Sequence, residues 1–66
     1  MNIKLNGEKR ELPDGLTVRA MLRHIGIQPE RVAVEINEQI IRKATYDDAV
    51  VRYSDSVEVV QIKGGG

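Results

Sequence analysis

Residues 1–25 read MNIKLNGEKRELPDGLTVRAMLRHI and contain two different hydrophobic periods. In the first part, Ile3 and Leu5 alternate with polar residues, which is the pattern of a strand with one buried face. Asn6-Gly7 is a strong signal for a two-residue hairpin turn, so residues 8–12 should return beside the first strand. The chain is therefore predicted to open with a β-hairpin.

The second period in this stretch is helical. Four apolar residues recur at spacings of three and four positions: Val18, Met21, Leu22 and Ile25. Thr17 suits the N-cap and Gly26 suits a left-handed residue after the last turn, so the helix should have about nine residues. Because so short a helix is not stable alone in water, its apolar stripe must lie across a sheet.

The rest of the chain supplies further strands. Residues 31–37 and 57–62 alternate, and residues 39–42 form a short strand after a turn, while residues 43–51 are irregular with room for one helical turn. The order strand, strand, helix, strand, short strand, strand is the layout of the β-grasp, or ubiquitin-like, fold. We therefore predict an α+β domain whose mixed sheet of about four or five strands carries one helix and has its last strand parallel to its first.

The composition argues against several classes of function. The 66 residues include ten Lys or Arg, ten Asp or Glu, one His and no Cys. These numbers exclude a disulfide framework, a thiolate zinc site and a cysteine nucleophile, and His24 alone cannot supply a two-histidine metal site. No set of nucleophile, base and orienting residue can be assembled, so an enzyme acting alone is disfavoured.

The same composition limits the partners. The net charge is zero with both signs interleaved, which leaves no basic stripe for nucleic acid. No apolar run exceeds three residues, so no membrane segment is expected, and a cytoplasmic protein follows. We expect a monomer when the protein is free, with no bound metal or cofactor.

The last predicted strand runs into Gly64-Gly65-Gly66. A glycine-rich end resembles a linker or a flexible tail, and that reading stays open. The alternative is chemical, because glycines without a Cβ can pass through a narrow channel and bring the carboxylate of Gly66 into another protein's active site. Residues 63–66 extend at most about 13 to 14 Å, enough to reach such a site while the domain stays outside.

The sequence resembles the ThiS family of sulfur carriers over nearly its whole length. The shared features are the opening Met-Asn-Ile-Lys-Leu-Asn-Gly, the central VAVEINEQII of residues 32–41, and a last strand that ends in three glycines. Members of that family often have Gly-Asp before the last strand, where this chain has Ser54-Asp55. The match thus retains the aspartate and departs at the glycine.

The resemblance implies a pathway for the tail. A ThiF-type enzyme would use ATP to adenylate the carboxylate of Gly66, and a sulfur-donating enzyme would supply the sulfur of a thiocarboxylate. Thiazole synthase, ThiG, would then accept the sulfur in thiamine biosynthesis. ATP belongs to the activating partner in this scheme, and the carrier itself holds no cofactor.

A partner surface beside the tail is also expected. If Val57 faces the core, alternation places Val60 and Ile62 on the opposite face, where with Lys63 they would form a docking patch. The alternative is that they are scattered surface residues with no role in docking.

The predicted domain spans residues 1–63, and residues 64–66 form its tail.

Two other functions remain open. One is a carrier like MoaD, the small subunit of molybdopterin synthase, or a carrier for another sulfur-containing metabolite. MoaD proteins are typically longer and often carry Phe-Pro-Pro before the tail, and this chain has no Phe. The other is a non-covalent β-grasp interaction module with a frayed end.

Tyr46 and Tyr53 are expected to pack their rings at the sheet edge with their hydroxyls in water.

Overall fold

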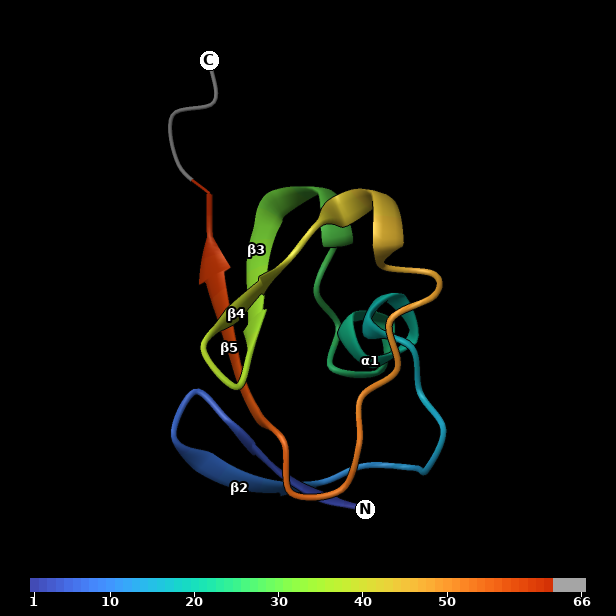
Figure 1. Ribbon diagram of the computed structural model, residues 1–66, viewed down its shortest axis with the longest axis vertical. Helices are drawn as coiled ribbons and strands as arrows, with labels where there is room; N and C mark the ends of the chain where they lie inside the picture. Colours follow the sequence, from blue (N-terminus) through green and yellow to red (C-terminus); the bar gives the residue numbers. More distant parts are fainter. Residues whose placement is uncertain (63–66) are drawn as a thin grey trace.

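The computed structural model describes residues 1–62 and contains five strands, one α-helix and two short 3-10 helices (Figure 1). The elements follow in the order β1 (Asn2–Leu5), β2 (Glu8–Glu11), α1 (Val18–His24), η1 (Pro29–Arg31), β3 (Val32–Ile36), β4 (Gln39–Ile41), η2 (Lys43–Thr45) and β5 (Ser56–Gln61). The strands and the α-helix follow the predicted order, η2 lies where one helical turn was expected, and η1 was not predicted. The helix is shorter than expected, with 7 residues, because Ile25 already serves as its C-cap.

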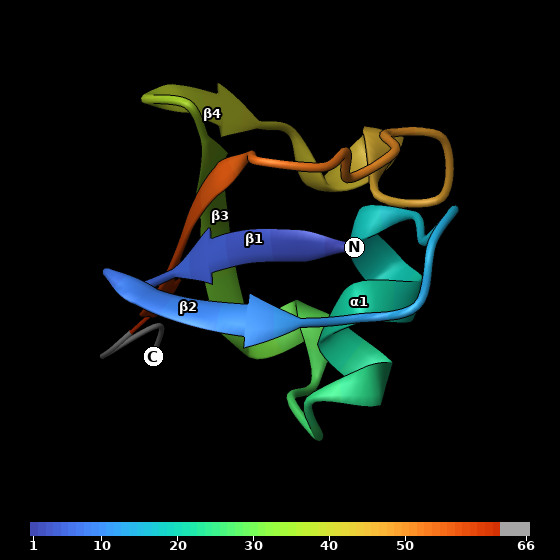
Figure 2. The same ribbon diagram turned by 90° about the horizontal axis from the view of Figure 1, so that it is seen from below.

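The strands form one mixed sheet in the order β2-β1-β5-β3-β4. β5 lies at the centre, parallel to β1 and antiparallel to β3, so the first and last strands are neighbours as the β-grasp layout predicts. Figure 2 shows α1 on one side of this sheet. We call the sheet face toward α1 the inner face and the opposite face the outer face.

Local sequence signals explain the ends of these elements. The hairpin turn places Asn6 at φ 50° and Gly7 at φ 84°, the left-handed conformation that a tight two-residue turn requires. At the start of α1, the hydroxyl of Thr17 accepts a hydrogen bond from the backbone N–H of Ala20 at 3.1 Å. At its end, Gly26 adopts φ 81° and stops the helix.

The core lies between α1 and the inner face of the sheet. The buried side chains come from α1, from β1, β3 and β5, from the residue after β2 and from the long loop before β5. They are Ile3, Leu5, Leu12, Val18, Met21, Leu22, Val32, Val34, Tyr46, Val51 and Val57. Val57 is fully buried, and Val59 packs against the same core. β5 therefore turns its odd-numbered residues inward, as the alternation predicted.

One of the two tyrosines, Tyr46, differs from expectation. Tyr46 is only 1 % exposed, and its hydroxyl donates a hydrogen bond of 3.4 Å to the backbone oxygen of Val32. Tyr53 is 73 % exposed and lines a pocket with Lys4 of β1 and Lys9 of β2, so it lies beside the edge strand β2 as expected. The prediction failed because Tyr46 follows η2 in an irregular stretch, where no periodicity shows which side chains turn inward. Burial raises the pKa of the Tyr46 hydroxyl above its ordinary value of 10.0.

Candidate functional site

The candidate site is the end of β5, because the predicted tail follows it directly. Val60 is 55 % exposed and Ile62 is 47 % exposed. Val60 lies directly opposite Ala33 of β3, which is also exposed. We call Ala33, Val60 and Ile62 the apolar band. The structure thus leaves apolar side chains uncovered beside the start of the tail, while Lys63 and Gly64-Gly65-Gly66 lie outside the described residues.

Backbone hydrogen bonds hold β5 on its β3 side up to the last described residue. The register pairs Val32 with Gln61, and the N–H of Ile62 donates to the oxygen of Arg31 at 2.8 Å. The ladder therefore continues one residue past the end of the strand. A segment attached to Ile62 starts from a fixed point on the sheet.

The side chain of Asn6 holds β5 on its other side. The amide oxygen of Asn6 accepts a hydrogen bond of 2.8 Å from the N–H of Val59, and its amide nitrogen donates to the oxygen of Val59 at 3.3 Å. This side chain extends the sheet beyond the point where β1 turns away into the hairpin. Sequence reasoning identified Asn6 as a turn residue and missed this second role, because the parallel register of β1 and β5 is not visible in the sequence.

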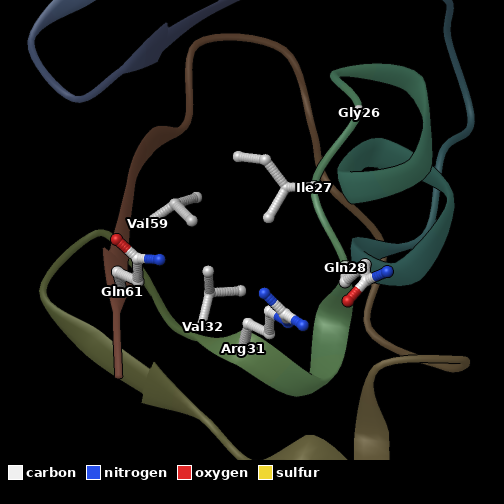
Figure 3. Close-up of a pocket in the computed structure, with 7 residues that line it drawn as sticks. All are labelled: Gly26, Ile27, Gln28, Arg31, Val32, Val59 and Gln61. Atoms are coloured by element: carbon white, nitrogen blue, oxygen red, sulfur yellow. The ribbon is translucent and has the colours of Figure 1, made fainter. Parts of the chain in front are cut away.

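A pocket of about 470 Å³ lies at the same end of β5, on its inner side. Figure 3 shows the apolar side chains of Ile27, Val32 and Val59 around the pocket, with polar groups beside them. The polar groups belong to Gln28, Arg31 and Gln61. Sequence reasoning missed this pocket. The sequence did contain an indication of it in Ile27, an apolar residue that follows Gly26 and is not part of the apolar stripe of the helix.

Two aspartates of the loops around β5 and α1, Asp55 and Asp47, have structural partners. The carboxylate of Asp55 accepts hydrogen bonds from the side chain of Asn37 and from the backbone N–H of Arg52, at 3.0 and 2.8 Å. Asp47 forms an ion pair with Arg19. Within residues 1–62 no group of three or more His, Cys, Asp or Glu residues is placed to hold a metal ion, and no helix is long and apolar enough to cross a membrane.

Ser54 occupies the position where the sequence departs from the ThiS pattern. It has φ 72°, in the left-handed region that favours glycine. The turn therefore has the shape that a glycine would adopt there. The departure changes the residue and keeps the backbone conformation.

Comparison with known proteins gives one consistent match. The family model described as the ThiS family matches residues 3–66. A protein named sulfur carrier protein ThiS from Thermus thermophilus is 39% identical over 62 residues, which cover 94% of this chain and 95% of that protein. The crystal structure of a thiamine biosynthesis protein (ThiS) from Geobacter metallireducens superposes with a TM-score of 0.87 at 30% identity, covering 100% of both chains.

Larger relatives contain a similar segment. Proteins named thiazole synthase from Magnetococcus marinus and Paramagnetospirillum magneticum are 41% and 38% identical to this chain over 66 residues. The chain spans 20% of the length of each of these two proteins. The family model covers nearly all of the sequence, and the carrier from Thermus thermophilus and the structure from Geobacter metallireducens match the chain over nearly their whole length. The chain belongs to the ThiS family.

Proposed function

We propose that this protein is a sulfur carrier in thiamine biosynthesis, whose reactive group is the carboxylate of Gly66. The observation that carries the proposal is the end of β5, a central strand fixed on both sides that is followed in the sequence by Ile62, Lys63 and three glycines. Membership of the ThiS family and the named carrier from Thermus thermophilus support it.

The first step that we propose is adenylation by a ThiF-type enzyme. A carboxylate oxygen of Gly66 attacks the α-phosphorus of ATP, pyrophosphate leaves, and the tail ends in an acyl-adenylate. A sulfur-donating enzyme then supplies sulfur at the oxidation level of sulfide, which attacks the acyl carbon; the bond to AMP breaks, AMP leaves, and the tail ends in a thiocarboxylate. The activating enzyme uses the ATP, so the carrier needs no bound cofactor.

In this proposal the protein is a co-substrate and not an enzyme. Its chemistry needs only a main-chain carboxylate that can be brought to another protein's catalytic residues. Residues 63–66 span at most about 13 to 14 Å when extended, so the domain can stay at the mouth of a channel while Gly66 enters it. Gly64 and Gly65 have no Cβ to contact the channel walls.

The partner surface that we propose consists of Val60, Ile62 and Lys63. Val60 and Ile62 are about half exposed and lie at the end of the strand that precedes the tail. An apolar centre of this kind suits an interface with the activating enzyme. Any partner that receives Gly66 must approach this end of the sheet.

We further propose that thiazole synthase accepts the sulfur. The two larger relatives that bear this name include a segment similar to this whole chain. A carrier and an acceptor within one protein would keep the thiocarboxylate close to the site that consumes it. This arrangement favours thiazole synthase over molybdopterin synthase as the acceptor.

Intact-protein mass spectrometry tests the proposal. The chain is co-expressed with a ThiF-type enzyme and a sulfur-donating enzyme, and a fraction should become heavier by the difference between one sulfur and one oxygen atom. A matched chain with one alanine added after Gly66 should show no such fraction, because its carboxylate is displaced and carries a Cβ. If the natural chain shows no mass shift while the enzymes process a known ThiS, the carrier function is wrong.

A further inference from the structure

Asn6 joins β1 to β5 with both its backbone and its side chain. Its backbone N–H donates a hydrogen bond of 2.8 Å to the oxygen of Val57. Its carboxamide makes the two bonds to Val59 described above, accepting from the N–H and donating to the oxygen. The side chain therefore continues the ladder between these strands at a point where the main chain has already turned into the hairpin.

The residue after Asn6 makes this carboxamide chemically labile. The backbone nitrogen of a following residue can attack the side-chain carbon of an asparagine, and a side chain on that following residue hinders the attack. Gly7 has no Cβ, and no atom of a more distant residue lies within 4 Å of the place that a Cβ would occupy. Asn6 is also exposed, so water reaches its carboxamide. The pair that forms the turn is thus also a pair of groups that can react.

Asn37 has a similar local structure without the glycine. Its φ is 52°, against 50° for Asn6. Its carboxamide is also held by two hydrogen bonds, donating to Asp55 at 3.0 Å and accepting from the N–H of Ser56 at 2.9 Å. The next residue is Glu38, whose side chain hinders attack by its backbone nitrogen. The chain therefore contains a matched asparagine that should be stable.

We propose that Asn6 is a site of spontaneous deamidation and that its conversion loosens the end of β5. The nitrogen of Gly7 forms a bond to Cγ of Asn6, the bond from Cγ to the carboxamide nitrogen breaks, and ammonia leaves with the proton from Gly7. Water then opens the resulting cyclic imide at one of its two carbonyl carbons, which leaves aspartate or isoaspartate at position 6. The reaction consumes water and needs no oxidant, metal or other reactant.

Neither product can remake the whole contact with β5. A carboxylate still accepts from the N–H of Val59, but it has no proton to donate to the oxygen of Val59. Two acceptor oxygens then repel each other where a hydrogen bond of 3.3 Å stood. Isoaspartate also adds a carbon atom to the main chain of the two-residue turn, which disturbs the register that sets Leu5 opposite Glu8.

The lost contact lies beside the candidate site. The pairing of β1 with β5 reaches only to Leu5 opposite Val57, so beyond that point the carboxamide of Asn6 supplies the attachment on this side of β5. After conversion, β3 becomes the main support of β5 up to Ile62. Because ammonia leaves, the change accumulates with the age of the chain. The bonds to Val59 restrain the carboxamide, so the reaction occurs when this end of β5 opens locally.

Ageing the purified chain tests the proposal. The natural chain is incubated in warm, mildly alkaline buffer without denaturant, and intact-protein mass spectrometry follows the replacement of an NH₂ group by OH. Peptide mapping locates the change. Asp14-Gly15 can form the same imide but returns to its original mass when water opens it, so it does not contribute to the signal. Nuclear magnetic resonance measures solvent exchange of the Val59 amide in fresh and aged chains.

Two variants separate the chemistry from its structural effect. Asn6→Asp supplies the aspartate product directly, without ageing. Glu38→Gly places a glycine after Asn37, at a φ of 69° that glycine adopts readily, so this variant should fold. Circular dichroism and thermal unfolding confirm that each variant is folded.

The natural chain should gain mass at Asn6 well before Asn37, and Glu38→Gly should gain mass at both asparagines. In the aged chain and in Asn6→Asp, the Val59 amide should exchange about fivefold faster or more, which corresponds to the loss of about one hydrogen bond.

Three results would overturn the proposal. The first is no gain of mass at Asn6 in the folded chain, and a gain that appears only in urea would assign the lability to the unfolded chain. The second is reaction at Asn37 as fast as at Asn6 in the natural chain, or no reaction at Asn37 in Glu38→Gly. The third is unchanged exchange at Val59 in the aged chain and in Asn6→Asp, which would show that conversion does not loosen β5.

Discussion

Replacing Val60 by aspartate should weaken activation of the carrier without unfolding it. Val60 is 55 % exposed, so about half of its side chain is available to a partner and little of the core depends on it. Burying a whole valine side chain contributes about 1.5–3 kcal/mol, so the exposed part corresponds to about 0.8–1.6 kcal/mol on docking. At about 1.4 kcal/mol per factor of ten, loss of this contact alone lowers kcat/KM by about 4- to 15-fold.

The aspartate adds a second penalty in the same direction. A carboxylate pressed against an apolar partner surface loses water without gaining a hydrogen bond, so Val60→Asp should exceed the effect of the lost contact. Val60→Thr separates the two contributions because threonine keeps the β-branched shape and adds no charge. We expect an intermediate decrease for threonine and at least about a tenfold decrease for aspartate.

The assay is ATP–pyrophosphate exchange by the ThiF-type enzyme over a range of carrier concentrations. Val50→Asp is a matched control, since Val50 is 43 % exposed and lies beside Thr17 at the start of α1, away from the end of β5. Thermal unfolding of both variants should give similar midpoints. If Val60→Asp is folded and its kcat/KM equals that of Val50→Asp, the apolar band does not contact the activating enzyme and the argument from exposure is refuted.

Three further predictions concern the fold that supports this surface. Ser54→Gly should stabilise the protein by about 0.5–1 kcal/mol in chemical denaturation, because glycine relieves the left-handed conformation at φ 72°; unchanged or lower stability would contradict this. Asn6→Gly keeps the turn conformation and removes two hydrogen bonds to Val59, so stability should fall by about 1–2 kcal/mol and the amide of Val59 should exchange faster with solvent. Unchanged exchange at Val59 would show that the Asn6 side chain does not hold β5. Because burial raises the pKa of Tyr46 above 10.0, its stabilising effect is complete below pH 10.0 and is lost as the pH rises through the folded value. Tyr46→Phe should remove this part of the alkaline loss of stability in urea unfolding, and an unchanged pH profile would show that Tyr46 does not cause it.

The local features of the fold could be predicted because each depends on neighbouring residues. The hairpin at Asn6-Gly7, the cap at Thr17 and the inward alternation of β5 all follow from spacing and turn chemistry, and the structure has them. The buried Tyr46 could not be predicted in the same way, since its neighbours in the chain form no repeating pattern. Its hydroxyl instead donates a hydrogen bond to the backbone oxygen of Val32 in β3, a residue 14 positions earlier in the chain.

The candidate site was predictable in part for the same reason. Alternation along β5 places Val60 outward without knowledge of any other strand. The position of Ala33 beside Val60 requires the register of β3 and β5, and the contact between Asn6 and Val59 joins residues 53 positions apart. Such features exist only once the strand order and register are set, so spacing along the chain contains no signal for them.

The two faces of the central strand meet different demands. Val57 and Val59 of the inner face pack in the core with α1, where an unpaired charge would be expensive, so this face supplies the stability of a small domain. The outer face is free of that demand and can carry charged and apolar side chains that stay exposed, such as Glu58 and Val60. β5 joins the two, because hydrogen bonds to β3 and to Asn6 on either side keep its end in register with the core. A change in the core near β5 should therefore disturb recognition only by shifting this strand, whereas a change on the outer face should disturb recognition while the fold stays intact.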